Sequence, residues 1–191
     1  MTTYLLHGGK TSINDLNNDR FFSEFANLVD KPEVKILLCY WARTKDQLKT
    51  KSEQDIFRIK KNTDKKLNFH LVENPQELLE KIPEYDVFYV AGGEAYLLEP
   101  YYPKLGFLKS KLKNKVYAGS SMGTFLASSN YVLSLDHQDN NTVHDGLGLL
   151  PISVLCHWNI ETKKNQKLKL LQQNNKPILV LNETEYVKIY K

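Results

Sequence analysis

The stretch VYAGSSMGTFLAS, Val116–Ser128, places two serines between glycines directly after a short apolar run. The residues VYA are typical of a buried strand, and TFLAS is typical of the start of a helix. A plain strand-to-helix turn needs one glycine or one capping residue, whereas this turn holds Gly119, Ser120, Ser121 and Gly123. The stretch therefore predicts a strand–turn–helix unit that presents a hydroxyl group at its turn.

Apolar runs alternate with helical segments around this unit. Five runs have the length and the β-branched or aromatic content of buried strands. They are TYLLH (3–7), EVKILLCYWA (33–42), KLNFHLVE (66–73), YDVFYVAGG (85–93) and KVYAGSS (115–121). Helical patterns occupy 19–30, the charged segment around Ile56 and Ile59, and 74–82, where Asn74 is the expected N-cap and Pro75 the first helical residue. This alternation predicts an α/β fold, with a mostly parallel sheet and helices on both faces.

The second half of the chain is less regular. Residues 129–148 are rich in Asn, Asp and His, which indicates a loop or an irregular hairpin. A strand in PISVLCHW (151–158), a helix near 163–173, and a final pair of strands in PILVLN (177–182) and EYVKIYK (185–191) follow. Because no linker or internal repeat interrupts the pattern, we expect one α/β domain over residues 1–191.

The composition is that of an ordinary soluble protein, with 41% hydrophobic and 25% charged residues. The net charge of +4 is spread, and the lysine-rich runs 49–66 and 163–169 lie in helical segments, where solvated faces are expected. Cys39 and Cys156 have apolar neighbours and are expected as buried free thiols. With no basic leader and no apolar run of about 20 residues, we expect a cytoplasmic protein that binds neither nucleic acid nor a membrane.

Three strand ends carry glycines, and ligands bind at the carboxyl ends of strands in sheets of this kind. These ends are HGG (7–9), AGGE (91–94) and AGSSMG (118–123). The last fits the pattern G-x-S-x-G, in which a serine on a tight turn projects its hydroxyl freely. Ser121 occupies the middle of that pattern, so it is the expected nucleophile, and the amide of Met122 is an expected oxyanion donor.

A serine nucleophile needs a base and a group that orients the base. His157 follows the apolar run PISVLC and is the preferred base, because a strand end holds an imidazole in place. The other four histidines are His7, His70, His137 and His144, and the residues alone leave the orienting acid open among Asp136, Asp139, Asp145 and Glu183.

Four segments in this order resemble the aspartyl dipeptidase and cyanophycinase family of serine peptidases. They are YVAGGEAYLL (89–98), YAGSSMGTFLAS (117–128), GLGLLPISVLCHW (146–158) and VLNETEYVKIY (180–190). The resemblance implies a flavodoxin-like fold akin to class I glutamine amidotransferases, and it implies no metal or organic cofactor. Residue by residue, it implies Ser121 as nucleophile, His157 as base, Gly92 and Gly93 in the oxyanion hole, and either Asp136 or Glu183 as the acid.

The resemblance also implies the substrate class and shows where this chain departs from its relatives. Short peptides with an aspartyl or β-aspartyl group are the implied substrates, and a homodimer stays open. Glu94 and Ala95 stand where relatives have Asn-Thr, and Asn182 stands in place of an acid. Met122 stands in place of a small alanine, so we expect its side chain to narrow the space beside the serine.

Three other interpretations remain open at this point. An α/β-hydrolase esterase would use HGG (7–9) as its oxyanion segment and Ser121, Asp136 and His157 in that order. A non-catalytic relative would keep the turn but bind a small molecule or peptide without reaction. A metal site would draw its ligands from the polar stretch, namely Asp136, His137, Asp139 and His144.

Overall fold

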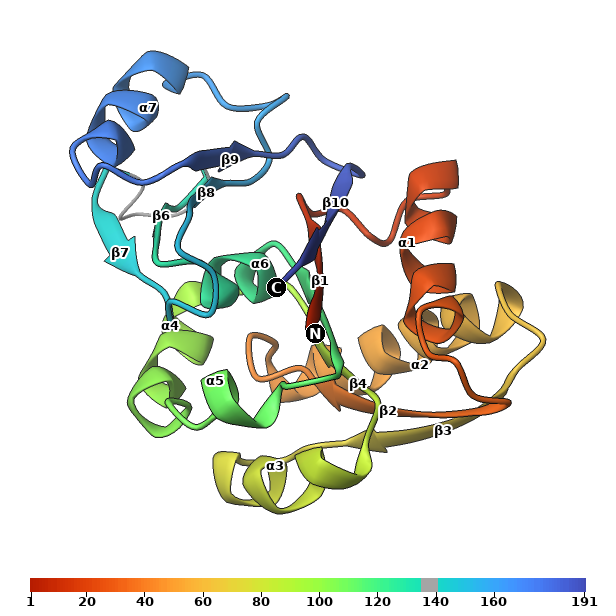
Figure 1. Ribbon diagram of the computed structural model, residues 1–191. Helices are drawn as coiled ribbons and strands as arrows, with labels where there is room; N and C mark the ends of the chain where they lie inside the picture. Colours follow the sequence, from red (N-terminus) through yellow and green to blue (C-terminus); the bar gives the residue numbers. More distant parts are fainter. Residues whose placement is uncertain (135–140) are drawn as a thin grey trace.

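A computed structural model describes residues 1–134 and 141–191 of the chain. A six-stranded sheet forms its centre, with the strand order β10-β1-β5-β4-β2-β3 (Figure 1). The strands are β1 (Thr3–His7), β2 (Glu33–Cys39), β3 (Lys66–Leu71), β4 (Val87–Val90), β5 (Val116–Ser120) and β10 (Tyr186–Tyr190). All neighbouring pairs are parallel except β1 with β10, so the predicted mostly parallel sheet is confirmed.

Helices cover both faces of this sheet. Successive side chains of a strand point to opposite faces, so an apolar strand presents hydrophobic side chains to both layers of helices. Leu5 packs with α1 (Leu16–Asn27) and α2 (Lys45–Lys61) in one core, whereas Leu6 packs with the helices of the other face. That face holds α3 (Pro75–Lys81), α4 (Ala95–Leu98), α5 (Leu108–Lys111), α6 (Met122–Ala127) and the 3₁₀ turns Ile82–Glu84 and Glu99–Lys104. The α/β architecture predicted from the alternation is therefore present.

Two helix starts show how local sequence sets the elements. The side chain of Asn74 accepts a hydrogen bond from the N–H of Glu77 at 3.0 Å, so the predicted N-cap of α3 is confirmed. Helix α1 begins at Leu16, three residues before the expected start, because the Asp15 carboxylate caps it by accepting from the N–H of Asn17 at 2.8 Å.

The second half of the chain forms a separate four-stranded sheet, which the sequence did not predict. Its order is β7 (Val143–Asp145), β6 (Asn130–Val132), β8 (Ser153–Leu155) and β9 (Ile178–Val180), with α7 (Lys164–Gln172) packed beside it. The expected final pair of strands is divided, because β9 joins this sheet and β10 joins the central one. The turn between them includes Thr184, whose φ of 65° redirects the chain.

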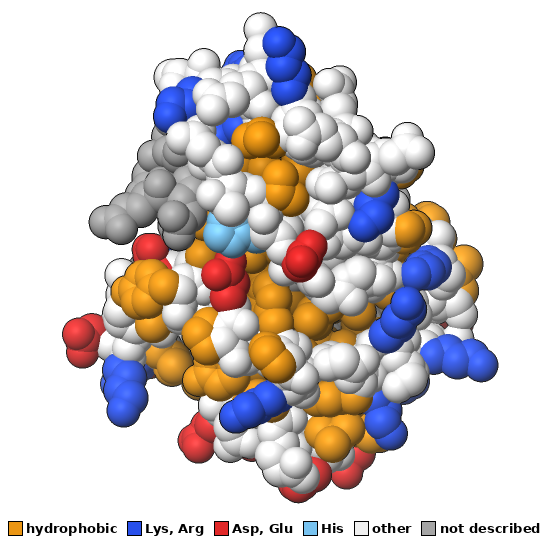
Figure 2. Space-filling view, turned by 90° about the vertical axis from the view of Figure 1, so that its left-hand side faces the viewer, with side chains coloured by type: hydrophobic (Ala, Val, Ile, Leu, Met, Phe, Trp, Pro, Cys, Tyr) orange, Lys and Arg blue, Asp and Glu red, His pale blue; other side chains and the backbone are white. Residues whose placement is uncertain are grey.

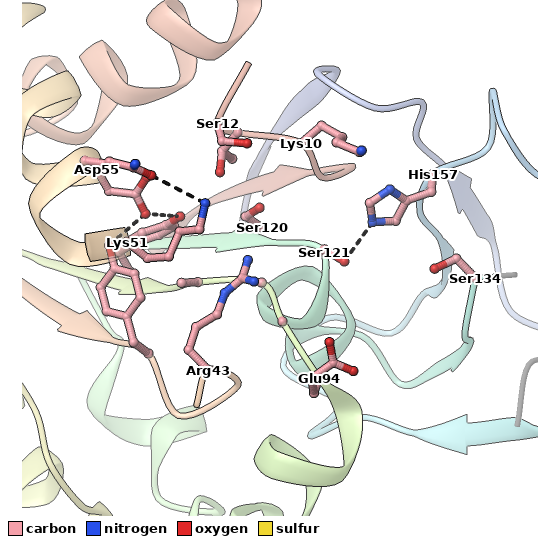
Figure 3. Close-up of a pocket in the computed structure, with 17 residues that line it drawn as sticks. Lys10, Ser12, Arg43, Lys51, Asp55, Glu94, Ser120, Ser121, Ser134 and His157 are labelled. Atoms are coloured by element: carbon pink, nitrogen blue, oxygen red, sulfur yellow. Dashed lines mark hydrogen bonds between the residues drawn. The ribbon is translucent and has the colours of Figure 1, made fainter. Parts of the chain in front are cut away.

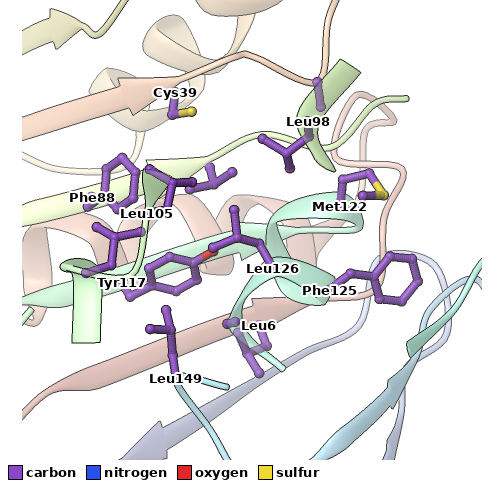
Figure 4. Packing of buried hydrophobic residues seen from close by; sticks show 14 of the residues in the cluster. Leu6, Cys39, Phe88, Leu98, Leu105, Tyr117, Met122, Phe125, Leu126 and Leu149 are labelled. Carbon is purple, nitrogen blue, oxygen red and sulfur yellow. The ribbon is translucent and has the colours of Figure 1, made fainter. Parts of the chain in front are cut away.

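The core buries Cys39 and Cys156 as free thiols, as predicted. Met122 also lies in the core, where its side chain is 1% exposed and packs in the same cluster as Leu98 and Phe125 (Figure 4). The expectation that Met122 narrows the space beside the serine is therefore wrong. As the first residue of α6, it points into this core instead of the solvent.

Most basic side chains lie at the surface, with one exception in the second lysine-rich run. On the face shown in Figure 2, lysine and arginine side chains are scattered, and hydrophobic side chains gather across the middle. Lys163 and Lys169 are exposed as expected, whereas Lys167 is only 1% exposed. Its ammonium group pairs with the buried carboxylate of Glu161 and donates to the backbone oxygen of Leu133 at 2.5 Å. Within the described residues, no helix has the length and apolar character needed to cross a bilayer.

Candidate active site

A cavity of about 260 Å³ opens at the carboxyl ends of the central strands (Figure 3). Its walls come from the segments that follow four neighbouring strands, namely 10–12 after β1, 40–43 after β2, 91–94 after β4, and 120–121 at the end of β5. Side chains from α2, Ser134 and His157 complete it. All three glycine-marked strand ends therefore meet at the edge of the sheet where ligands bind in such folds.

Ser121 lies at the bend between β5 and α6, with φ 49° and ψ −105°. This is a conformation that non-glycine residues rarely adopt, and it is the strained turn of a nucleophile elbow. The neighbouring glycines are required by space. A Cβ atom at Gly119 would lie 2.5 Å from the carbonyl carbon of Gly123, and one at Gly123 would lie 2.0 Å from the oxygen of Val90.

The hydroxyl of Ser121 contacts His157, and His157 contacts Glu183. Ser121 Oγ lies 3.0 Å from His157 Nε2, and His157 Nδ1 lies 2.9 Å from Glu183 Oε1. If Nδ1–H donates to the carboxylate, Nε2 is free to accept the serine proton, which is the arrangement of a serine hydrolase. We call these three residues the triad. Ser120 also lines the cavity, but the hydrogen bond to His157 that is drawn in Figure 3 comes from Ser121.

Hydrogen bonds fix the backbone of the triad at both His157 and Glu183. His157 has φ 55°, and its N–H donates to the backbone oxygen of Gly8 at 3.2 Å. The N–H of Glu183 donates to Oδ1 of Asn159 at 2.8 Å. The imidazole of His157 and the carboxylate of Glu183 are mostly buried, with 16% and 13% of their side chains exposed. Their contact is therefore shielded from water, which strengthens it.

Of the acids left open by the sequence, Glu183 is the one that the structure places on His157. Asp136 and Asp139 lie outside the described residues. Asp145 accepts a hydrogen bond from Nδ2 of Asn130 at 2.7 Å, in the second sheet.

The predicted oxyanion donors lie beside Ser121 in different ways. Gly93 lines the cavity, and a Cβ atom there would lie 2.0 Å from the oxygen of Ala42, so this position accepts only glycine. Gly92 packs against the nucleophile turn, since its Cβ would lie 3.0 Å from Cβ of Ser121. Met122 follows Ser121 in the chain, and its buried side chain leaves its backbone amide as the only group it could offer. Donation by Gly93 and Met122 to an oxyanion stays a prediction.

Charged groups that the sequence analysis did not select line the other end of the cavity. Lys51 and Asp55 lie there, Arg43 extends between Lys51 and Ser121, and Lys10 and Glu94 lie on the side of the triad (Figure 3). Nε of Arg43 is buried and has no hydrogen-bond partner within the described part of the chain. The cavity thus offers both cationic and anionic groups to a ligand.

Asp55 is a buried acid held by two tyrosines. The hydroxyls of Tyr40 and Tyr89 donate to its Oδ2 at 2.7 and 3.2 Å. Burial raises the pKa of Asp55 to about 6, and the two hydrogen bonds and nearby arginines oppose this shift only in part. A signal was present in the sequence, because Asp55 precedes the buried Ile59 by four residues and so shares its helix face.

The remaining histidines do not join the triad. His70 contacts Oε1 of Glu77 at 2.6 Å, and His144 contacts Oε1 of Glu99 at 3.0 Å. His137 lies outside the described residues. Over residues 1–134 and 141–191, no group of three or more His, Cys, Asp or Glu side chains could hold a metal ion.

The fold and the triad contacts define a serine-type hydrolase of the flavodoxin-like class. The chain belongs to peptidase family S51, whose family model matches residues 4–191. This is the aspartyl dipeptidase family, so the resemblance inferred from the sequence is confirmed, and the chain is a serine-type peptidase by membership.

Two solved structures share this fold. A putative peptidase E protein from Listeria monocytogenes EGD-e is 18% identical, with a TM-score of 0.63 over 100% of this chain and 99% of that chain. A peptidase from an acI-B1 actinobacterium is 15% identical, with a TM-score of 0.70 over 99% of this chain and 83% of that chain. Comparison with curated proteins gives no match.

Proposed function

We propose that this chain hydrolyses short peptides through an acyl-enzyme formed on Ser121. The observation that carries the proposal is the line of contacts from Ser121 Oγ to His157 Nε2 at 3.0 Å and from His157 Nδ1 to Glu183 at 2.9 Å. A hydroxyl becomes a useful nucleophile when a positioned base takes its proton, and a buried carboxylate supports the imidazolium that results.

In this mechanism Ser121 attacks the scissile carbonyl carbon while His157 accepts the hydroxyl proton. The tetrahedral oxyanion accepts hydrogen bonds from the amides of Gly93 and Met122, each worth roughly 3 kcal/mol of barrier. His157 then protonates the leaving amine, and the C–N bond breaks. A water molecule, deprotonated by the same histidine, attacks the ester and releases Ser121. Glu183 accepts the hydrogen bond of Nδ1–H and so holds the imidazole in the required tautomer.

The charges in the cavity support an acidic residue on the amino side of the scissile bond. A substrate carboxylate would find the guanidinium of Arg43, whose buried Nε has no other partner within the described residues. A substrate ammonium group would find Glu94 or Asp55. The implied substrates are therefore short peptides that begin with an aspartyl or β-aspartyl residue.

Peptide turnover by the purified protein tests this proposal. We expect hydrolysis of an aspartyl dipeptide, a much lower kcat/KM for its asparaginyl analogue, and covalent labelling of Ser121 by a fluorophosphonate probe. In the variant Arg43→Gln the preference for the aspartyl substrate should shrink through a rise in KM, because the guanidinium no longer pairs with the carboxylate. Equal turnover of both dipeptides by the wild-type protein would rule out the acidic preference.

A non-catalytic binding role is the second candidate, and Glu94 is the observation that favours it. Its carboxylate lines the cavity near the triad, where negative charge opposes the formation of an oxyanion. The same probe separates the two roles. Folded protein that binds an aspartyl dipeptide in calorimetry, but is not labelled at Ser121, would be a binding protein.

A further inference from the structure

The HGG segment (7–9) has no part in the proposed chemistry, although it lies beside the triad. His7 ends β1 and is fully buried. Its backbone oxygen accepts a hydrogen bond from the N–H of Ser121 at 2.9 Å, and its N–H donates to Oγ1 of Thr124 at 3.0 Å. The backbone of His7 is thus bonded directly to the nucleophile turn.

The imidazole of His7 makes two hydrogen bonds of its own. Nδ1 accepts from the N–H of Gly9 at 3.0 Å, and Nε2 lies 2.8 Å from Oδ1 of Asn18. Both bonds form together only in the neutral tautomer that carries its proton on Nε2. Burial lowers the pKa of His7 to about 4, and nearby His157 acts in the same direction, so the neutral form prevails at neutral pH.

These bonds also remove one of the alternative interpretations. The N–H of Gly9 donates a hydrogen bond to Nδ1 of His7, and the N–H of Gly8 donates one to the backbone oxygen of Glu185 at 2.8 Å. Neither amide is left for an oxyanion, so the esterase interpretation loses the segment on which it was based.

Asn18 and Arg58 hold the rest of the loop that follows, residues 8–13. Nδ2 of the buried Asn18 donates to the backbone oxygens of Lys10 and Ile13 at 3.0 and 2.9 Å. The guanidinium of Arg58 donates to the oxygens of Ser12 and Ile13 at 2.7 and 3.0 Å, and also to that of Thr11. The loop is therefore fixed through its carbonyl groups by side chains of α1 and α2.

This loop lies directly against His157 and the turn that carries Glu183. A Cβ atom at Gly9 would lie 2.2 Å from Cε1 of His157 and 2.5 Å from its Nε2, so the glycine backbone is packed against the imidazole. The oxygen of Gly9 accepts from the N–H of Thr184 at 3.0 Å. If the loop moved outward, the imidazole would gain room to swing away from Ser121.

We propose that His7 and Asn18 are positioning residues that hold the loop 8–13 against His157 and so keep its Nε2 aimed at Ser121. The proposal rests on the proposed function, since it assigns both residues to the same reaction. Neither side chain touches the reacting atoms. Their effect reaches the triad through Gly8 and Gly9, and misplacement of a catalytic group by about 1 Å can cost on the order of a hundredfold in rate.

The test compares two His→Phe variants in strands of the central sheet. His7→Phe keeps the ring contact with Phe21, at 4.7 Å between centroids, and loses both hydrogen bonds. His70→Phe is the control, because it loses the contact with Glu77 at a site that does not line the cavity. We expect kcat of His7→Phe to fall about ten- to a hundredfold with KM within about twofold, and both constants of His70→Phe to stay within about twofold of wild type.

A second variant and a second measurement keep the outcome clear. Where His7→Phe does not fold, Asn18→Ala cuts the bonds to the loop carbonyls while His7 stays, and the same loss of kcat is expected. A kcat within about twofold of the His70→Phe control in both variants overturns the proposal. If the wild-type protein hydrolyses no peptide, the proposed function fails by itself. In that case the positioning role is tested by the ¹⁵N chemical shifts of the imidazole nitrogens of His157. We expect these shifts to change in His7→Phe or Asn18→Ala, and unchanged shifts in both variants would overturn the positioning role.

Discussion

Nδ1 of His157 lies 2.9 Å from Oε1 of Glu183, and the two residues come from different connections of the second sheet. His157 follows β8, whereas Glu183 lies in the turn that leads from β9 to β10. Ser121 comes from the end of β5 in the central sheet. The triad is therefore assembled across the two sheets, and it depends on how they pack together.

The two adjacent serines should differ in their importance. Ser121→Ala should abolish peptide hydrolysis and fluorophosphonate labelling, because it removes the hydroxyl that contacts His157 at 3.0 Å. Ser120→Ala should keep a measurable fraction of kcat/KM. Steady-state kinetics with circular dichroism as the folding control checks this, and an equal loss in the two folded variants would contradict Ser121 as nucleophile.

The orienting acid should be identified by a pair of isosteric changes. Glu183→Gln should lower kcat/KM by about 10³- to 10⁴-fold, because an amide at this position no longer fixes the tautomer of His157. Asp136→Asn should leave kcat/KM within about threefold, since Glu183 already occupies Nδ1 of His157. The kinetics of both variants check the assignment, and the reverse ranking would move the role to Asp136.

Asp55 should make stability depend on pH. Its folded-state pKa of about 6 lies above the ordinary aspartate pKa of 3.8, so the folded state holds the proton more tightly than the unfolded state. The stability linked to this proton is present at pH 4 and is lost as the pH rises through about 6. Urea denaturation at pH 4 and pH 7 measures this. Over that range the free energy of unfolding of the wild-type protein should fall by roughly 1–3 kcal/mol relative to that of Asp55→Asn. A difference that does not vary with pH would contradict the raised pKa.

The buried ion pair of Lys167 and Glu161 should matter far more than a surface pair. Lys167→Met leaves the Glu161 carboxylate buried without its partner, so the free energy of unfolding should fall by roughly 3–5 kcal/mol. The double variant Lys167→Met/Glu161→Gln should recover most of this loss. Lys188→Met, which breaks the more exposed pair with Glu24, should cost at most about 1 kcal/mol. Urea denaturation measures all three, and similar costs for the two single variants would contradict the buried pair's importance.

Local patterns predicted those parts of the molecule that local forces determine. The strand of residues 3–7, the cap at Asn74 and the turn at Ser121 all appear as expected, because apolar runs, caps and tight turns leave signatures within a few residues. The contact between His157 and Glu183 spans 26 residues; the residues alone left four acids open for it, and the family resemblance narrowed them to Asp136 and Glu183. Spacing alone could not select Glu183 from the other acids.

The errors have equally physical causes. Met122 was expected to narrow the space beside the serine because it stands in place of a small alanine, but the bend at Ser121 turns this side chain into the core. Arg43 and Asp55 were missed because each becomes part of the cavity only when β2 and α2 take their places in the fold, with β4 between β2 and β5. The second sheet was missed because its strands have only three residues each, too short for a periodic signal.

Four of the non-glycine residues with positive φ, namely Lys10, Ser121, His157 and Thr184, lie in the cavity, in the triad or beside it. Each such conformation costs on the order of 1 kcal/mol or more in folding free energy. Selection for stability alone would replace these residues with glycine or asparagine. Their presence marks positions where the fold is less stable than it could be, and where the backbone instead fixes the geometry of the proposed reaction. An engineer could recover part of it at Lys10 or Thr184, and should leave Ser121 and His157 untouched.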